Sequence, residues 1–433
     1  MTWLIPAVLI IAVASAWLLQ LGKRESYLPP GPPTLPLIGN IHNLPTSYLH
    51  YRFTEWARKY GGIFSLKIGS QTLIVLNTME HVKELLDRRN AATAGRPQLH
   101  VADMITKGRY FVFMQPGTVP PVDKLPILGY IPERWAPWKA LLKEVQRKHH
   151  ELYFGFFEEC ERRMMTDNDS EGSSGSLVEE LLRQTQEHGM DRDTLVYLGA
   201  VLIEAGAETT SSLLKSLVLF LVASPEAQNK AYEEVVRVVD AILKEVQRLR
   251  PVAPLGVPHA TTTTEEYLGY TIPENTTIFP NVYAINHDPE FFEDPESFRP
   301  ERYLTTEHGT KPGVDDRAFR ADIGFGFGRR ACPGMYLARN SLMLVAMNLI
   351  WAFEFKPLLD PKTGSIIPVD LDAYEEGLSF TPKSFQCRIN PRSESAVDII
   401  EHQYREAAET FVKYERDLAP EDKEWVRESR RDW

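Results

Sequence analysis

Residues 325–334 read Phe-Gly-Phe-Gly-Arg-Arg-Ala-Cys-Pro-Gly, and this stretch is the most informative one in the chain. One cysteine, Cys332, lies in a glycine-rich loop, and residues 335–353 follow with the apolar periodicity of a buried helix. Glycines let the backbone approach a bulky flat ligand and direct N–H groups at a sulfur. Such N–H groups, with a helix N-terminus beside them, stabilise a thiolate. The stretch therefore suits a metal-ligating thiolate, with a buried structural cysteine as the alternative.

The spacing Phe-x-x-Gly-x-Arg-x-Cys-x-Gly resembles, position for position, the haem-binding loop of the cytochrome P-450 superfamily. The resemblance implies that Cys332 is the axial ligand of a haem (heme b) iron, where a thiolate pushes electron density that favours O–O cleavage. It also implies that Arg330 pairs with a haem propionate, a role that a guanidinium fork suits. The other loop residues that the resemblance places at the cofactor are Phe325, Gly326 and Gly334.

The composition is that of a large globular protein in a reducing compartment. The 433 residues are 43% hydrophobic and 10% aromatic, enough to bury an extensive core. Three cysteines, Cys160, Cys332 and Cys387, are too few and too scattered for a disulfide framework. The formal net charge of -11 argues against a nucleic-acid partner, which would need a basic surface.

The N-terminus predicts a membrane anchor. Residues 3–21 are nearly all apolar, and about 20 apolar residues span a bilayer core. A cleaved signal peptide is the alternative, but Lys23 and Arg24 follow the apolar run and no basic residue precedes it. The positive-inside rule then places the body in the cytosol. We expect a single-pass anchor over residues 1–24 and a stiff proline-rich hinge over residues 25–36, similar to microsomal P-450s of the endoplasmic reticulum.

The body predicts a mainly α fold with a small β region, similar to the P-450 fold. Residues 60–69 and 71–76 read as two strands joined by a short turn. Residues 138–165 and about 191–223 read as long helices. The resemblance extends the haem domain over residues 37–392, and residues 393–433 form a charged, helical tail outside it.

The second long helix contains the sequence Ala205-Gly-Ala-Glu-Thr-Thr210. A glycine within a helix costs about 0.5–1 kcal/mol relative to alanine, so it needs a packing or functional reason. A site of close helix packing is one reading. The other is a groove for a diatomic ligand, with a hydroxyl and an acid beside it. The segment matches the oxygen-activation motif of the P-450 family, which makes Thr209 the hydroxyl and Glu208 the acid.

Glu245 and Arg248 lie three residues apart on a predicted helix and share a face. A surface ion pair of this kind contributes under about 1 kcal/mol. In the P-450 family the pair is buried and bound to a downstream arginine, which the resemblance identifies as Arg302. The three residues would hold this helix to the segment that carries Cys332.

Two further segments match family positions near the substrate. Residues 251–259 are apolar and proline-rich, and the resemblance places His259 near a propionate, with a surface histidine as an equal alternative. The turn at residues 378–380 corresponds to a second substrate-contacting turn. The residues that the resemblance places beside substrate are Ala205, Val252, Leu255, Val257 and Phe380.

Two segments of the family pattern are missing from the chain. After Gln115 the family continues into a helix with Trp-x-x-x-Arg, which holds a propionate and offers a basic face to the reductase, whereas this chain continues with Pro116. A second, shorter gap falls between Asp240 and Ala241. We therefore expect an incomplete P-450 fold that retains haem less well and turns over slowly.

The resemblance implies a haem-thiolate monooxygenase that inserts one oxygen atom of dioxygen into a lipophilic small molecule. Electrons would come from NADPH through NADPH–cytochrome P-450 reductase, and the chain is similar to fungal enzymes of secondary metabolism. A reductase-independent haem-thiolate isomerase is one alternative, against which Glu208 and Thr209 argue. An inactive or impaired remnant is another, which the missing segments favour.

Overall fold

The computed structural model describes residues 20–109, 121–123, 126–166, 176–320, 322–377, 379–415, 418 and 420–431. Residues 1–19 of the predicted anchor and the predicted gap after Gln115 lie outside the described residues, as does Leu378. The predicted junction between Asp240 and Ala241 lies inside a continuous helix, α11 (Val235–Leu249), whose buried apolar face continues across it.

Helices dominate the described chain, as predicted. The N-terminal part contains α2 (Leu49–Tyr60), α3 (Met79–Val82), the π-helix η2 (Lys83–Arg88), α4 (Asn90–Thr93) and α5 (His100–Thr106). The middle contains α6 (Pro137–Thr166), α7 (Leu177–Arg183), α8 (Thr185–His188), α9 (Arg192–Ala223), α10 (Pro225–Glu233) and α11. The C-terminal part contains α12 (Val282–Asn286), α13 (Arg302–Thr305), α14 (Met335–Ala352), α15 (Glu394–Glu415) and α16 (Pro420–Arg431). The short 3-10 turns are η1 (Ile41–Asn43), η3 (Pro121–Asp123), η4 (Pro126–Tyr130), η5 (Glu133–Trp135), η6 (Ile323–Phe325) and η7 (Gly328–Arg330).

The β region is small. Its strands are β1 (Ile63–Ile68), β2 (Gln71–Leu76), β3 (His259–Ala260), β4 (Glu265–Tyr267), β5 (Tyr270–Ile272), β6 (Thr277–Pro280), β7 (Phe353–Pro357), β8 (Tyr374–Glu376), β9 (Phe380–Pro382) and β10 (Cys387–Pro391). The largest sheet has the order β1-β2-β6-β3, with β2 and β6 parallel and the other pairs antiparallel. Because β3 is the edge strand, its residue His259 lies at the border of this sheet.

The strand pair and the two long helices that the sequence predicted are present. The predicted strand pair forms β1 and β2, and Ile63 pairs with Leu76 in antiparallel register. The two predicted long helices form α6 and α9. The start of α9 is fixed by Asp191, whose Oδ1 accepts a hydrogen bond from the Thr194 N–H at 2.8 Å, the arrangement of an N-cap.

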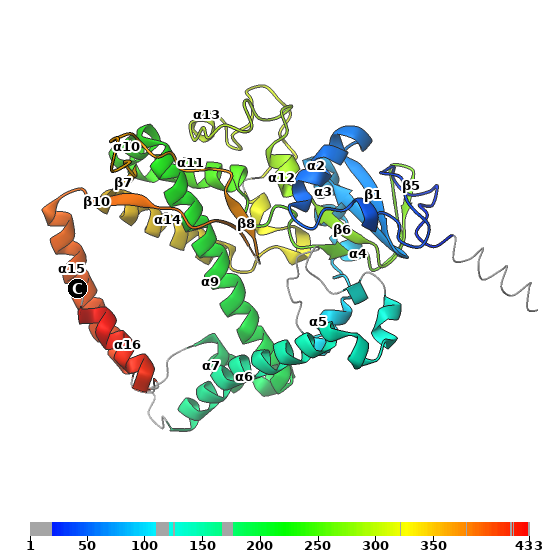
Figure 1. The fold of residues 1–433 in the computed structure, drawn as a ribbon, viewed down its shortest axis with the longest axis horizontal. Coiled ribbons are helices and arrows are strands. Elements are labelled where there is room, and N and C mark those ends of the chain that lie inside the picture. Colours follow the sequence, from blue (N-terminus) through cyan, green and yellow to red (C-terminus); the bar gives the residue numbers. More distant parts are fainter. Residues whose placement is uncertain are drawn as a thin grey trace, which may run out of the picture.

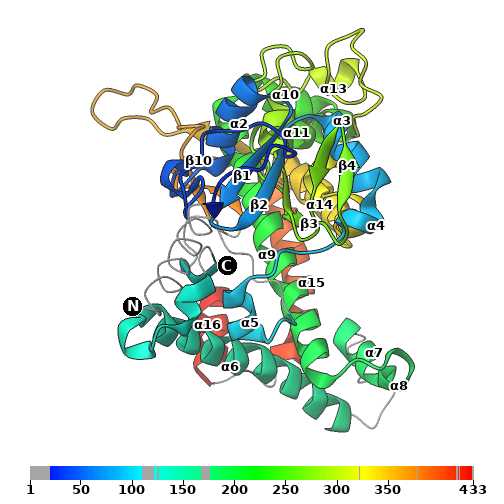
Figure 2. The ribbon, with the colours of Figure 1, turned by 90° about the vertical axis from the view of Figure 1, so that its right-hand side faces the viewer.

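The chain forms a compact part and a more open part, and α9 runs through both (Figure 1). Figure 2 shows strands β1 to β4 together with α2, α10, α11, α13 and α14 in the compact part, and α5 to α8 in the other. In the compact part, the C-terminal half of α9 forms a core with α11 and α14, which includes Leu217, Val246 and Ala346. In the open part, the N-terminal half of α9 packs on α6 through Leu195 and Phe154.

Helix α9 is long and apolar enough to cross a membrane by composition alone. Its packing against α6, α11 and α14 instead makes it the central helix of a folded body. The charged tail forms α15 and α16. Helix α15 follows β10, which pairs with β7, so the tail leaves the compact part beside the end of α14 (Figure 1).

Candidate active site

The loop over residues 325–334 turns back on itself and keeps its cysteine accessible. Gly326 and Gly328 both have positive φ, 83° and 53°, a conformation that side chains rarely adopt. The Cys332 N–H donates to the Phe325 carbonyl at 2.7 Å, which closes the loop. The Cys332 side chain is exposed and forms no disulfide. The thiol is therefore open to a ligand.

The loop is attached to η2 by a close backbone contact. The Gly328 N–H donates to Asp87 Oδ1 at 2.8 Å. A Cβ atom at position 328 would overlap the Leu86 carbonyl oxygen, so this contact requires glycine. The neighbouring Phe327 side chain is fully buried in the core beside the main sheet. These contacts fix where the thiol can lie.

Two residues that support this loop were not predicted from the sequence. Asp87 also forms an ion pair with Arg320 at 3.4 Å, and Arg320 donates to the Gly326 carbonyl. Asp87 and Gly328 are 241 positions apart. No local pattern links positions at this separation, so only the folded structure reveals the contact.

Arg330 and Arg96 bring two guanidinium groups together near the loop. Arg330 Nε donates to the Ala94 carbonyl at 2.7 Å, and Arg96 Nη1 donates to the Pro258 carbonyl at 2.7 Å. Burial and the nearby charge of Arg330 lower the pKa of Arg96 to about 10. Sequence reasoning missed Arg96, although the Gly-Arg-Pro run at residues 95–97 marks a turn that positions it.

His259 completes this basic cluster and is not a surface residue. Its side chain is buried, and Nδ1 lies 2.9 Å from the Thr93 carbonyl oxygen. Burial lowers its pKa, the hydrogen bond to the Thr93 carbonyl opposes this, and the charges of Arg96 and Arg330 add to the lowering, so that the pKa is about 4. The structure thus favours the buried alternative for His259 and places it with two arginines from distant segments.

The central turn of α9 carries the predicted hydroxyl and acid. Thr209 Oγ1 donates to the Ala205 carbonyl one turn earlier at 2.6 Å. Glu208 Oε1 accepts hydrogen bonds from the Ser379 hydroxyl at 3.0 Å and from the Ser379 N–H at 3.3 Å. A Cβ atom added at Gly206 would meet no atom within 4 Å. The helix is therefore open beside Gly206, and Glu208 is held toward the β8–β9 turn.

Four of the five residues predicted beside substrate lie in two neighbouring segments, and the fifth, Ala205, lies on α9. The Phe380 N–H donates to the Val252 carbonyl at 2.8 Å, which joins the two predicted turns. Phe380 is buried and Leu255 packs against a core beside β1. The Val257 carbonyl accepts from Arg96 at 3.3 Å, so this end of the segment reaches the basic cluster.

Glu245 lies at the centre of a buried ionic cluster. Its carboxylate receives two hydrogen bonds from Arg248, at 2.8 and 2.9 Å, and one from Arg302 at 3.1 Å. The Arg299 N–H donates to the same carboxylate at 2.9 Å. The Glu245 side chain is 0% exposed, so its charge depends on these partners. The structure brings together the three residues that the sequence analysis grouped.

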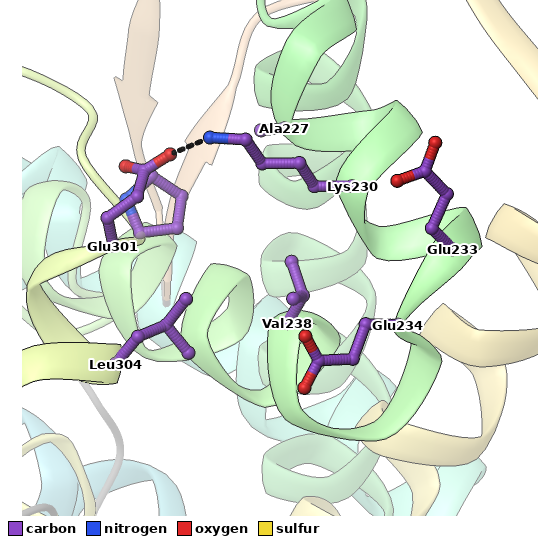
Figure 3. Close-up of a pocket in the computed structure, with 8 residues that line it drawn as sticks. Ala227, Lys230, Glu233, Glu234, Val238, Glu301 and Leu304 are labelled. Atoms are coloured by element: carbon purple, nitrogen blue, oxygen red, sulfur yellow. Dashed lines mark hydrogen bonds and ion pairs between the residues drawn. The ribbon is translucent and has the colours of Figure 1, made fainter.

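A cavity of about 240 Å³ lies elsewhere, between α10, α11 and α13. Figure 3 shows the ion pair of Lys230 and Glu301 across its mouth, at 3.1 Å. The lining residues are Ala227, Lys230, Glu233, Glu234, Val238, Pro300, Glu301 and Leu304. None of the residues discussed above lines it, so this cavity is separate from the cysteine loop.

A sequence profile of the cytochrome P450 family, written P-450 here, matches residues 29–119 and 110–386. The chain belongs to the cytochrome P-450 family. It is 35% identical to a cytochrome P-450 monooxygenase of Armillaria gallica, over 93% of this chain and 96% of that relative. It is 32% identical to the cytochrome P-450 monooxygenase ple5B of Rhodocybe pseudopiperita, over 91% and 95%. The chain is accordingly a P-450 monooxygenase.

This P-450 is shorter than the relatives that it matches. The alignment with the Armillaria gallica relative extends over 508 positions, which exceeds the 433 residues of this chain. That relative therefore contains segments that this chain lacks. The positions at which they are lost, near residues 115/116 and 240/241, stay predictions.

The residues of the P-450 site fit a haem. The accessible thiol of Cys332 is a soft ligand of the kind that iron accepts. Arg330, Arg96 and His259 form a basic cluster that suits two carboxylates, because a buried carboxylate needs charged hydrogen-bond donors. Gly206 has open space around it, which leaves room for a flat group to approach the backbone of α9.

Proposed function

We propose that this P-450 monooxygenase inserts one oxygen atom of dioxygen into a lipophilic small molecule of fungal secondary metabolism. Electrons would come from NADPH through NADPH–cytochrome P-450 reductase. The accessible Cys332 thiol in a glycine-shaped loop is the observation that carries this proposal. The apolar side chains of Val252, Leu255 and Val257 support a lipophilic substrate, and the fungal relatives support the setting.

The residues of the candidate site fall into groups with different roles in the proposed reaction. Haem bound at Cys332 would supply the oxygen chemistry. Arg330, with Arg96 and His259 nearby, would compensate its carboxylates, and Phe325, Gly326 and Gly334 would border it. Thr209 would donate a hydrogen bond toward the open side of α9 in place of the Ala205 carbonyl, and Glu208 would pass protons inward.

The decisive test of the thiolate is a set of three cysteine variants. Cys332→Ala should abolish the thiolate-type absorption spectrum of the reduced, carbon-monoxide-treated protein. Cys160→Ala and Cys387→Ala should retain it, because burial raises the pKa of both thiols and opposes a thiolate there. An unchanged spectrum in Cys332→Ala would contradict the proposal.

The reaction itself is tested with membranes that contain the protein. Incubation with candidate lipophilic substrates and NADPH, followed by mass spectrometry, should reveal products 16 mass units heavier than the substrate, the mass of one oxygen atom. Thr209→Ala should keep the consumption of NADPH and divert it to peroxide, whereas Thr210→Ala at the adjacent position should not. Equal product per NADPH in both variants would leave Thr209 only a packing role.

We also propose that residues 1–24 anchor the protein in the endoplasmic reticulum membrane, with the body in the cytosol. The apolar run at residues 3–21 and the basic residues after it support this proposal. Deletion of residues 1–24 should move much of the protein to the soluble fraction. Protection of the body from added protease in intact microsomes would contradict the orientation.

A second candidate is a P-450 impaired by its missing segments. The start of α14 supports this candidate. Tyr336 and Leu337, directly after the cysteine loop, are 73% and 74% exposed. A helix that is apolar on every side is normally covered on every side. The test is to insert the missing segments from a relative and to compare haem per protein and NADPH-dependent product. Equal values in both forms would rule out impairment.

A further inference from the structure

We propose that Ser379, in the turn between β8 and β9, is the positioning residue for the carboxylate of Glu208. The proposal rests on the proposed monooxygenation and adds a residue to it. Ser379 donates both its hydroxyl and its backbone N–H to Glu208 Oε1, at 3.0 and 3.3 Å. Two donors on one residue define the place of that oxygen more closely than one would. Bonds to an ionised acceptor are also stronger than those between neutral groups.

The Ser379 hydroxyl is itself held in place by α9. Ser379 Oγ and Ser212 Oγ are 2.6 Å apart, and both side chains are buried. Ser212 lies four residues after Glu208, so the two side chains project from the same face of the helix. The Ser379 hydroxyl can then donate to Glu208 while it accepts the Ser212 hydroxyl hydrogen. This arrangement satisfies both buried hydroxyls and orients the donor at the acid.

The contact between α9 and the β8–β9 hairpin continues for one more turn of the helix. Tyr374 OH donates to Ser216 Oγ at 3.0 Å, and Ser216 donates to the Ser212 carbonyl at 3.1 Å. Glu208, Ser212 and Ser216 therefore form a polar stripe at four-residue spacing on a mainly apolar helix, and the β8–β9 hairpin lies along it. A stripe of serines that bond only to their own helix would be unremarkable in an apolar helix. Here the partners come from a hairpin more than 150 positions later.

The arrangement has a direct consequence for proton transfer. Both hydrogen bonds to the Glu208 carboxylate within the described chain reach Oε1. Oε2 accepts no hydrogen bond from the described residues and is thereby left for water. An acid delivers protons efficiently only within hydrogen-bond reach of its acceptor. Without Ser379, the Glu208 side chain would sample several rotamers and would spend less time in the productive one.

The activity test uses the full-length protein and five variants, one of them a double variant. Ser379→Ala should keep the thiolate-type carbon monoxide spectrum and the substrate concentration for half-maximal rate, but should lower product per NADPH on the order of tenfold, as expected for a lost bond to a charged group. Ser379→Thr should restore most of it. Ser211→Ala is the matched control, because Ser211 donates to the Glu208 backbone carbonyl and not to the carboxylate. In a Glu208→Gln background, Ser379→Ala should have no further effect.

Several results would overturn the proposal. Unchanged product per NADPH in Ser379→Ala, an equal loss in Ser211→Ala, or an undiminished effect of Ser379→Ala in the Glu208→Gln background would each do so. A second readout does not depend on turnover. The melting-temperature shifts of Ser379→Ala and Glu208→Ala should be less than additive when combined, because each substitution removes the same contact. If the parent protein lacked the carbon monoxide spectrum, the proposed function would fail, and additive shifts would then still contradict the contact.

Discussion

The Glu245 cluster and the Cys332 loop differ in how the protein encloses them. Glu245 is completely buried and receives hydrogen bonds from Arg248, Arg302 and the backbone of Arg299. Cys332 is exposed, and the helix that follows it exposes Leu337. A structural charge is stable inside the protein only when it is fully paired. A group that must bind a ligand has to stay accessible, so its surroundings hold its backbone and not its side chain.

The largest effect should come from removing the centre of the buried cluster. Glu245→Ala leaves the guanidinium groups of Arg248 and Arg302 buried without their carboxylate, which costs about 3–5 kcal/mol of unfolding free energy. Glu234→Ala is the matched control, because Glu234, the N-cap residue of α11, pairs with Arg237 at the same spacing but both are exposed. That pair should contribute under about 1 kcal/mol. Denaturant unfolding measures both, and similar losses would show that burial does not set the value of the pair.

Two leucines on α14 test the same contrast for apolar packing. Leu342 is 4% exposed in the compact core, and Leu344 is 58% exposed two residues later. Leu342→Ala should cost about 2–4 kcal/mol through lost contacts and a cavity, whereas Leu344→Ala should stay within about 0.5 kcal/mol. A large cost for Leu344→Ala would mean that another element covers this face in solution.

The attachment of the cysteine loop gives a third, smaller effect. Gly328→Ala places a Cβ against the Leu86 carbonyl in a backbone conformation that alanine disfavours, so we expect a loss of about 1–3 kcal/mol. Gly364→Ala is the control for the conformation alone, because Gly364 has φ of 69° with open space around it. Haem per protein and denaturant unfolding should both fall more for Gly328→Ala. Equal losses would mean that the close contact adds nothing.

The pH dependence of stability gives a fourth test, which is read as a slope against pH and not as a single loss. His259 has a folded pKa of about 4, below its ordinary value near 6.5. Below pH 6.5 the unfolded chain therefore binds a proton that the folded chain rejects. Stability should fall as the pH drops from about 6.5 to about 4, by up to about 1.4 kcal/mol per pH unit. His259→Gln should reduce this slope, and His402→Gln, at an exposed position on α15, should not.

Loading the protein with haem gives a second form of the same pH test. A carboxylate beside His259 would raise the pKa of the imidazole, so loading with haem should flatten the acid-dependent loss. Denaturant unfolding of the haem-free and haem-loaded protein at several pH values measures the difference. An identical slope in both forms would place the haem carboxylates away from His259.

The local features of this structure, its helices and their buried faces, could be predicted from the sequence. The helical periodicity after Asp191 predicted α9, and the spacing of Glu245 and Arg248 predicted a shared helix face. The contacts of Asp87 with Gly328 and of Ser379 with Glu208 could not be predicted, because they join segments 241 and 171 positions apart. Periodicity predicts which face of a helix is buried. It does not predict which side chain from a distant segment will contact that face.

The candidate site likewise has residues that the sequence could predict and residues that it could not. Family resemblance predicted the roles of Cys332 and Arg330 from the spacing of the loop motif. It predicted a role for His259 from the proline-rich segment, with a surface histidine as an equal alternative. Arg96 lay outside that spacing and emerged only when the fold brought the end of α4 beside β3. The burial of His259 was equally undecidable from the sequence, since it depends on the Thr93 carbonyl and on two arginines from other segments.

Helix α9 belongs to two hydrophobic cores. This double attachment should determine the order in which its backbone amide protons exchange with solvent. Residues near Leu195 are buried with α6, and residues near Leu217 are buried with α11 and α14. The turn between them carries Gly206, and Leu202 and Ile203 beside it are exposed. Backbone amides exchange fastest where few apolar contacts restrain them. The amides around Gly206 should therefore exchange before those at either end, which makes the centre of this 32-residue helix its least stable turn.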